Sequence, residues 1–289
     1  MTAATAKRAL LGLYIGLFFL YLFGPLLVMG ISAFNTSSYP TVIPFEGFTW
    51  DWFIALARDK DMIYGLQNSL IIGVCVVALA VPVGLAGAIM MQQIYPRARG
   101  FYYLVVVSPV LTPGVIIGIS TVIFWRDLTT TLGSRLLYNG DFLTVLGQSS
   151  FISAYCMLIC IARLQRFDRA LEEAGLDLGA TRTQIFFHIL LPFMRPALLS
   201  SAVLAFLSSF ENYNTTTFAI LADKTLTTVL AGRVRQGSTP AISALAVVII
   251  AVTVCGALLY EVLKRRDDAR KARLLRVAST AEAQDLAIA

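Results

Sequence analysis

The sequence predicts an all-α integral membrane protein with six transmembrane helices. Hydrophobic residues make up 57% of the 289 residues and charged residues only 14%, which is too few to cover the surface of a soluble domain of this length. The apolar residues also form runs of roughly 20 residues, the length that a helix needs to cross a bilayer. Strand-like alternation is absent from these runs, and a backbone in lipid must pair with itself, so we expect helices.

The six predicted spans are separated by polar loops or by loops rich in proline and glycine. In chain order they cover Leu10–Phe34, Gln67–Met91, Phe101–Trp125, Phe142–Ala162, Pro196–Leu221 and Ala241–Leu263. The first run is longer than the apolar part of a cleaved signal peptide, roughly 7–15 residues, so we interpret it as an uncleaved helix. In the third span, Pro109 and Pro113 each remove a backbone donor, which predicts a kink there.

The distribution of positive charge predicts the orientation of the chain. Of the 23 basic residues, 16 lie in segments 1–9, 92–100, 163–195 and 264–289, which share one side of the membrane. Because basic residues are enriched in cytoplasmic loops, we expect both termini to be cytoplasmic. The basic residues are scattered over several loops, which gives no support for nucleic-acid binding. Residues 1–9 are then a cytoplasmic lead and 264–289 a basic tail, whose last dozen residues we expect to be disordered.

Smaller features of the spans and of the longest loop give weaker predictions. The external loop 35–66 contains a short helix, Asp51–Arg58, beside aromatic residues suited to the headgroup level. Two small-residue pairs, Gly12 with Gly16 and Gly114 with Gly118, favour close helix approach within the chain or to a partner. The four cysteines lie in apolar spans, and we expect packing rather than metal binding because no further ligands lie near them; they are Cys75, Cys156, Cys160 and Cys255.

Segment 163–195 is long, rich in mixed charge and predicted to be cytoplasmic. Its pattern predicts two short helices with a break between them. In the first helix, Leu171, Ala174 and Leu178 share one face, and Gly179 suits the left-handed residue that ends a helix. Thr181 to Gln184 matches a capping box at the start of the second helix. That helix should run to about Leu190 and end or bend before Pro192.

The first of these helices has an acidic polar face. Glu172, Glu173 and Asp177 would be repelled by anionic lipid, whereas helices that lie on membranes usually have basic polar faces. We therefore expect the helix to dock in a groove of a protein partner.

The same segment resembles the EAA loop found in permease subunits of binding-protein-dependent ABC importers. The family pattern is Glu-Ala-Ala, three residues, Gly, nine residues, Ile, one residue, Leu-Pro. This chain matches it in register at Glu173, Ala174, Gly179, Ile189, Leu191 and Pro192, and departs from it only at Gly175. The run from Leu66 to Leu70 also resembles the Asn-Ser start of the second span in that family.

The resemblance implies a type I importer permease fold in a bacterial inner membrane. It implies an ABC ATPase dimer, a periplasmic substrate-binding protein and a second permease subunit, which in our interpretation is homologous but not identical and forms a heterodimer with this chain. Coupling to the ATPase would involve Glu172, Glu173, Ala174, Gly175, Asp177, Leu178, Gly179, Ile189, Leu191 and Pro192. No GxxxxGK[ST] phosphate loop occurs in the sequence, so we expect no catalytic residues and no cofactor on this chain, with ATP and Mg²⁺ held by the partner ATPase.

A polar run in the fifth span is the candidate substrate pathway. Glu211, Asn212, Tyr213 and Asn214 are predicted in the middle of an apolar helix, where an ionisable group usually faces a cavity or a partner. An internal ion pair or a protonated Glu211 is the alternative interpretation. The layout, including the runs 226–230 and 239–245, resembles the polyamine branch of the family, in which an acidic pair occupies 211–212.

Asn212 in place of the second acid leaves other solutes open. Related permeases for ferric iron, thiamine or opines share the architecture that the resemblance implies. Two other classes of protein are also considered. A secondary transporter would need its own ion site and usually has internal repeats. A membrane enzyme would need clustered catalytic side chains, whereas His188, the single histidine, has no acidic or cysteine partner placed by the sequence.

Overall fold

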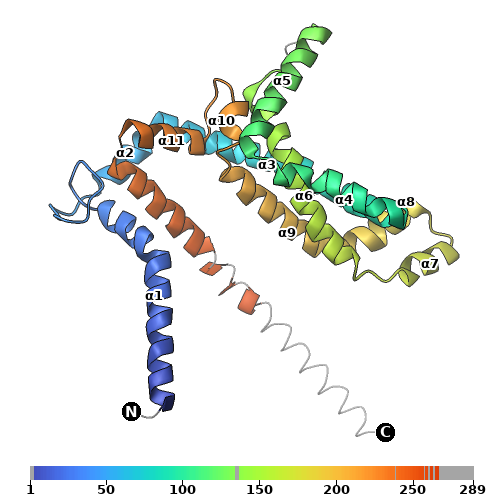
Figure 1. Cartoon of the computed structure of the whole chain (residues 1–289), viewed down its shortest axis with the longest axis horizontal. Coiled ribbons are helices and arrows are strands. Elements are labelled where there is room, and N and C mark those ends of the chain that lie inside the picture. The colour runs from blue at the N-terminus through green and yellow to red at the C-terminus, as the bar shows by residue number, and fades with distance from the viewer. Residues whose placement is uncertain are drawn as a thin grey trace. The chain divides into compact units, whose positions relative to one another are not determined.

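The computed structural model describes residues 3–133, 137–237, 239–256, 258–259, 261–262 and 264–266. Most of the tail at 264–289, including the part predicted to be disordered, lies outside the described residues. Figure 1 shows an assembly of helices, and by residue contacts the chain divides into two units, Met1–Arg58 with Gln236–Ala289, and Asp59–Arg235.

The first unit contains α1 (Ala3–Ser32), α2 (Asp51–Arg58) and a helix at Pro240–Gly256. The hydroxyl group of Ser32 donates to that of Ser243 over 2.9 Å, which links the end of α1 to the last of these helices. Asn35 is fully buried and organises the loop that follows α1, because its amide donates to the carbonyl groups of Thr41 and Pro44. The predicted short helix at 51–58 is confirmed.

The second unit contains the remaining helices. They are α3 (Lys60–Gln93), α4 (Pro96–Leu111), α5 (Gly114–Leu132), α6 (Gly140–Leu164), α7 (Ala170–Asp177), α8 (Arg182–Ile185), α9 (Leu191–Phe210), α10 (Thr216–Ala219) and α11 (Leu226–Gln236), with a π-helical turn at Phe186–Leu190 between α8 and α9. Helices α3, α6 and α9 pack against one another and form the core (Figure 1).

Five helical stretches in the described part of the chain are long and apolar enough to cross a membrane. They are Leu10–Ser32, Lys60–Gln93, Gly114–Leu132, Gly140–Leu164 and Arg182–Phe210; the helix Pro240–Gly256, in the sixth predicted span, is apolar but shorter. The all-α membrane fold predicted from composition is confirmed.

Two predicted spans differ from the structure. The third, predicted as a kinked helix over Phe101–Trp125, is two helices, α4 and α5, because the backbone becomes extended at Thr112 and Pro113 has no N–H to continue the helical bonding. The fifth, predicted as one helix over Pro196–Leu221, starts earlier and stops at Phe210. A turn separates it from α10.

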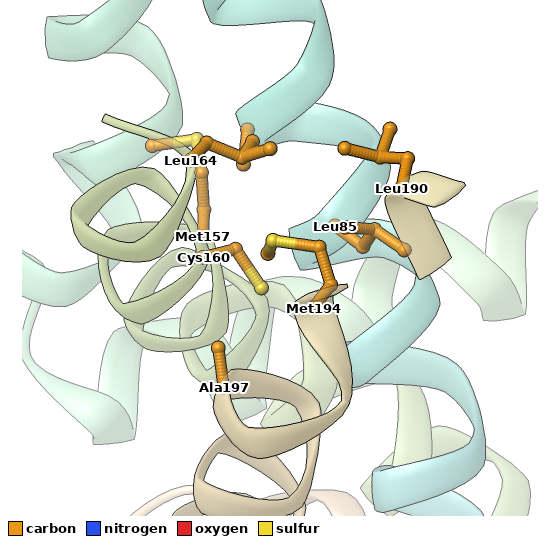
Figure 2. Close-up of a cluster of buried hydrophobic side chains, with 8 residues drawn as sticks. Leu85, Met157, Cys160, Leu164, Leu190, Met194 and Ala197 are labelled. Carbon is orange, nitrogen blue, oxygen red and sulfur yellow. The ribbon is translucent and has the colours of Figure 1, made fainter. Parts of the chain in front are cut away.

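The core at one end of the α3, α6 and α9 bundle is built from small and flexible apolar side chains. Figure 2 shows Leu85 of α3 facing Met157 and Cys160 of α6 and Met194 of α9. Gly84 permits the close approach of α3 to α6, since a Cβ atom there would lie 2.8 Å from the backbone nitrogen of Met157. The prediction that Cys156 and Cys160 are buried packing residues is confirmed, whereas Cys75 and Cys255 are exposed.

The two predicted small-residue pairs differ in how closely other atoms approach them. A Cβ atom at Gly118 would lie 2.6 Å from the carbonyl oxygen of Thr215, and one at Gly114 would lie 2.9 Å from the hydroxyl oxygen of the same residue. This pair therefore serves the packing of α5 against α10 within the subunit. Gly12 and Gly16 on α1 have no described atom within 4 Å of their Cβ positions.

Candidate functional site

The acidic segment is a helical hairpin. Its first helix, α7, ends where Gly179 adopts a left-handed backbone with φ of +83°, as predicted. Two backbone hydrogen bonds close the C-terminal end of α7. The amide of Gly179 donates to the carbonyl oxygen of Leu176, and the amide of Ala180 donates to that of Gly175. Glycine suits this position because a side chain in the left-handed region is strained.

The predicted capping box at the start of α8 is confirmed. The amide of Gln184 donates to the hydroxyl oxygen of Thr181 over 3.3 Å, and the side-chain oxygen of Gln184 accepts from the amide of Thr181 over 2.8 Å. Both bonds are local, which is why the sequence was sufficient to predict them.

The second helix does not end before Pro192, so of the two predicted outcomes the end is wrong, while the bend stays a prediction. Residues Phe186–Leu190 form a π-helical turn, and α9 continues directly from Leu191. Proline has no N–H and its ring crowds the carbonyl group four residues earlier. The wider π turn immediately before Pro192 is a known way to absorb such a defect without ending the helix.

Gly175 is the contact point between the two arms of the hairpin. It is the buried residue of α7, and a Cβ atom at this position would lie 3.2 Å from Cγ1 of Ile185 and 3.4 Å from Cδ1 of Ile189. The departure from the family pattern at this position thus coincides with a close approach of α7 to the following helix. Ile189, a residue of the matched pattern, contributes to that contact.

A stripe of apolar residues next to Gly175 on α7 is uncovered within the described residues. Leu178 is 89% exposed and Leu171 50% exposed, and Ala174 between them is also exposed. Glu173 and Asp177 lie beside this stripe and are exposed as well. We call Leu171, Ala174, Leu178 and Asp177 the α7 outer face.

A cavity of about 600 Å³ lies on the inner side of the hairpin. Its walls combine an apolar floor with side chains of both charges, and they include Ile89, Leu164, Phe167, Arg169, Glu172, Glu173, Leu176, Arg182 and Leu190. Glu172 is half-buried in this wall, so it does not belong to the α7 outer face.

The hairpin is anchored to the membrane core through the helix that follows it. Leu190, Met194 and Ala197 belong to the buried cluster that Figure 2 shows. Arg163, at the end of α6, donates to the carbonyl oxygen of Phe193 over 3.2 Å and lies 4.1 Å above the ring of that residue. The hairpin is thus mechanically continuous with α9. Leu191 and Pro192 lie at this junction and are partly buried.

The predicted pathway residues do not lie in the middle of a helix, and that part of the prediction is wrong. Glu211 is the C-terminal cap of α9, and the residues that follow form a turn before α10. We call residues 211–215 the α9–α10 break. Glu211 is exposed and forms no ion pair among the described residues. The helix ends here because Asn212 captures the backbone amides that follow.

Each of the other three predicted residues has a defined environment. The side-chain oxygen of Asn212 accepts from the amides of Thr215 and Thr216, over 3.1 and 3.2 Å. The hydroxyl oxygen of Tyr213 accepts from the guanidinium group of Arg235 over 2.8 Å. Asn214 is exposed. Asn212 is therefore primarily a capping residue, while Glu211 and Asn214 present their side chains to the surface of this unit.

The segment after α10 is tied to the start of α3. The side-chain amide of Asn68 donates to Asp141 and to the carbonyl group of Lys224, and the hydroxyl group of Ser69 accepts from the amide of Leu226. The Asn-Ser motif noted in the sequence therefore holds the chain that leads into α11. The guanidinium group of Arg233 also reaches Asp59, at 2.7 Å.

Sequence reasoning missed one functional candidate, Gln148. This residue lies in α6 and is 1% exposed, and its amide bonds to both sides of the α9–α10 break through Ser209 and Thr216. The available signal was a polar amide within the apolar fourth span.

Comparisons with known proteins agree with this geometry. The family described as binding-protein-dependent transport system inner membrane component matches residues 80–267. The putrescine transport system permease protein PotI of Escherichia coli K12 is 31% identical over 257 residues, which cover 87% of this chain and 90% of that protein. The spermidine/putrescine permease protein PotC of Haemophilus influenzae is 25% identical over 86% of this chain and 93% of its own length.

Solved structures show the same fold. A bacterial ABC transporter that imports the acidic polysaccharide alginate matches with a TM-score of 0.65 at 19% identity, covering 88% of this chain and 93% of that chain. An amino acid ABC transporter matches with a TM-score of 0.52 at 18% identity, covering 76% of this chain and 100% of that chain.

Proposed function

We propose a specific role for this chain from the premise that it belongs to the family of binding-protein-dependent transport system inner membrane components. It is a permease subunit of an ABC importer, and the α7 hairpin is the element through which a partner ATPase drives it. A small solute would pass from a periplasmic binding protein to the cytoplasm by alternating access. The hairpin and both termini would lie on the cytoplasmic side, in agreement with the charge bias.

The observation that carries this proposal is the division of α7 into two sides. Gly175 packs against Ile185 and Ile189, which fixes the helix to the rest of the subunit. The α7 outer face, in contrast, leaves Leu178 almost fully exposed beside Asp177. An amphipathic helix with exposed apolar anchors and a rigid base fits a groove on a protein partner. Because the helix continues into α9, a displacement of the groove would reach the membrane core.

The partners follow from this assignment. A partner ATPase dimer would hold ATP and Mg²⁺, and a second permease subunit would complete the passage. We favour a homologous but different second permease. The external face would receive the loaded binding protein.

The proposed substrate class is polyamines. Support comes from the printed activity of the relatives, putrescine and spermidine transport, and from Glu211, a carboxylate at the surface of the α9–α10 break with no ion pair among the described residues. A fixed negative charge stabilises an ammonium group most strongly where water is excluded.

Two observations favour a solute other than a polyamine. The guanidinium group of Arg235 bonds to Tyr213, two residues from Glu211, and Asn212 stands where the polyamine branch has a second acid. These two features reduce the negative charge of the α9–α10 break. The alternative is therefore the same importer mechanism for another solute, such as ferric iron, thiamine or an opine.

Two experiments test the proposal in the complete complex reconstituted in lipid vesicles. For coupling, cysteine at position 178 in a background without the four native cysteines should crosslink to the ATPase subunit. Crosslinking at position 132, which is also exposed but lies at the end of α5, is the control. Failure of residue 178 to capture the ATPase would contradict the coupling role.

For the substrate, ATP-dependent uptake of labelled putrescine and spermidine is compared between the natural chain and Glu211→Gln. We expect a loss of roughly fivefold, because removing an ion pair at an exposed carboxylate costs about 1 kcal/mol. Asp127→Asn, an exposed acid paired with Arg126, is the control. Unchanged uptake in Glu211→Gln would remove Glu211 from the pathway, and uptake driven by an ion gradient without ATP would indicate a secondary transporter.

A further inference from the structure

Gln148 is buried, and both the nitrogen and the oxygen of its side-chain amide form hydrogen bonds. Its side-chain nitrogen donates to the hydroxyl oxygen of Thr216 over 2.7 Å, and its side-chain oxygen accepts from the hydroxyl group of Ser209. Ser209 lies in the last turn of α9 and Thr216 is the first residue of α10. A single side chain of α6 thus bridges the two ends of the α9–α10 break.

The bridge continues into the break itself. Because the hydroxyl group of Thr216 accepts from Gln148, its proton is free to be donated, and it is directed at the side-chain oxygen of Asn212 at 3.2 Å. The same oxygen holds the amides of Thr215 and Thr216. Gln148 therefore orients the atom that ends α9 and starts α10.

The surrounding backbone leaves little room for another arrangement. Gly147, next to Gln148, would place a Cβ atom 3.2 Å from the methyl group of Thr215, and Gly118 of α5 would place one 2.6 Å from the carbonyl oxygen of that residue. Thr215 is thus held between α5 and α6 and is fully buried. The α9–α10 break is held in place by packing against α5 and α6 and by hydrogen bonds from α6.

Packing alone does not explain an amide at position 148. A buried amide without partners costs free energy, and an apolar side chain of similar size would fill the site with no such requirement. We propose that Gln148 is a positioning residue for the α9–α10 break: it sets the place at which Glu211 stands in the transport pathway. This rests on the proposed function for the role of Glu211, but the ordering of the break by Gln148 is a separate, directly measurable claim.

The test uses Gln148→Met, which keeps length and apolar volume but removes both hydrogen-bonding ends. In the reconstituted complex, hydrogen–deuterium exchange of the Thr215 and Thr216 amides should become about tenfold faster. The reason is that losing a buried hydrogen bond shifts the equilibrium for local opening by a factor of about that size. The maximal rate of substrate uptake should fall by a similar factor. The concentration of loaded binding protein that gives half-maximal uptake should not change, because docking involves the external face.

A triple variant separates positioning from stability. Gln148→Met with Ser209→Ala and Thr216→Val removes every polar group that the single change leaves unpaired, so thermal stability should recover. Exchange of the Thr215 amide should remain fast and substrate uptake should remain low, because Asn212 has still lost its link to α6. Ser201→Ala is the matched control, since Ser201 is a fully buried hydroxyl of α9 that contacts Cys160 and not the break; it should alter neither readout.

Two results would overturn the proposal. The first is an unchanged hydrogen–deuterium exchange rate of the Thr215 and Thr216 amides in Gln148→Met. The second is a return of both the exchange rate and the uptake rate to those of the natural chain in the triple variant. Failure of the proposed function would look different. If the complex did not transport polyamines, or if Glu211→Gln had no effect, faster exchange in Gln148→Met would still show that Gln148 orders the break.

Discussion

Gly175 of α7 lies so close to Ile185 of α8 that a Cβ atom at position 175 would be 3.2 Å from Cγ1 of that side chain. At this residue the backbone of α7 packs directly against side chains of the following helix. In the proposed coupling role, a movement imposed on the α7 outer face would reach α8 and α9 through this contact as well as through the loop at Gly179.

The first prediction concerns the size of the residue at position 175. Gly175→Ala should be tolerated, because Ile185 and Ile189 need to shift by only a few tenths of an ångström and alanine stabilises a helix by about 1 kcal/mol over glycine. Gly175→Leu should separate α7 from α8 and reduce the stimulation of ATPase activity by loaded binding protein. Both variants are compared by ATPase assays in the reconstituted complex. Equal coupling in the two variants would show that the contact is unimportant.

The second prediction concerns the backbone at Gly179. No described atom lies within 4 Å of a Cβ atom placed there, so any cost of substitution comes from the left-handed conformation alone. Gly179→Val should destabilise the hairpin by about 1–2 kcal/mol and uncouple ATP hydrolysis from transport, whereas Gly179→Asn should be nearly neutral because asparagine tolerates this conformation. Uptake per ATP hydrolysed is the measurement. Full coupling in Gly179→Val would argue against a rigid hairpin.

A third prediction uses the acceptor role of Asn212. Aspartate at this position keeps an oxygen for the amides of Thr215 and Thr216, so Asn212→Asp should fold normally. It also adds a negative charge beside Glu211. Uptake of a dication such as putrescine should then increase relative to that of a neutral solute. Competition between labelled putrescine and candidate solutes measures this preference, and a decrease in putrescine uptake would favour a substrate other than a polyamine.

The two small-residue pairs provide the fourth prediction. Gly118→Ala should destabilise the subunit by about 1–3 kcal/mol, because its Cβ atom would overlap the backbone of Thr215. Gly16→Ala is the matched control, since no described atom lies within 4 Å of that position. Thermal unfolding in detergent compares them. Similar midpoints for Gly118→Ala and the natural chain would mean that α5 and α10 can move apart at little cost.

Features that depend on neighbours in the sequence were predictable. The long apolar runs predicted the helices, and the capping box at Thr181 and the left-handed Gly179 were recognised because their partners lie within a few residues. The acidic outer side of α7 was predicted for the same reason, since a helix repeats every 3.6 residues.

Features that depend on contacts between distant segments required the tertiary structure. Glu211 was predicted inside a helix because the polar run that contains it is flanked by apolar segments. In the structure Asn212 ends that helix, and Gln148, some sixty residues away along the chain, completes the hydrogen bonds. Gly175 departs from the family pattern, and only the structure places Ile185 against it. The sequence by itself determined which segments are helical and where the hairpin turns, because these follow from local hydrogen bonding and hydrophobicity. Only the folded bundle decided where helices break and which glycines are required, because burial brings together atoms that the sequence does not place side by side.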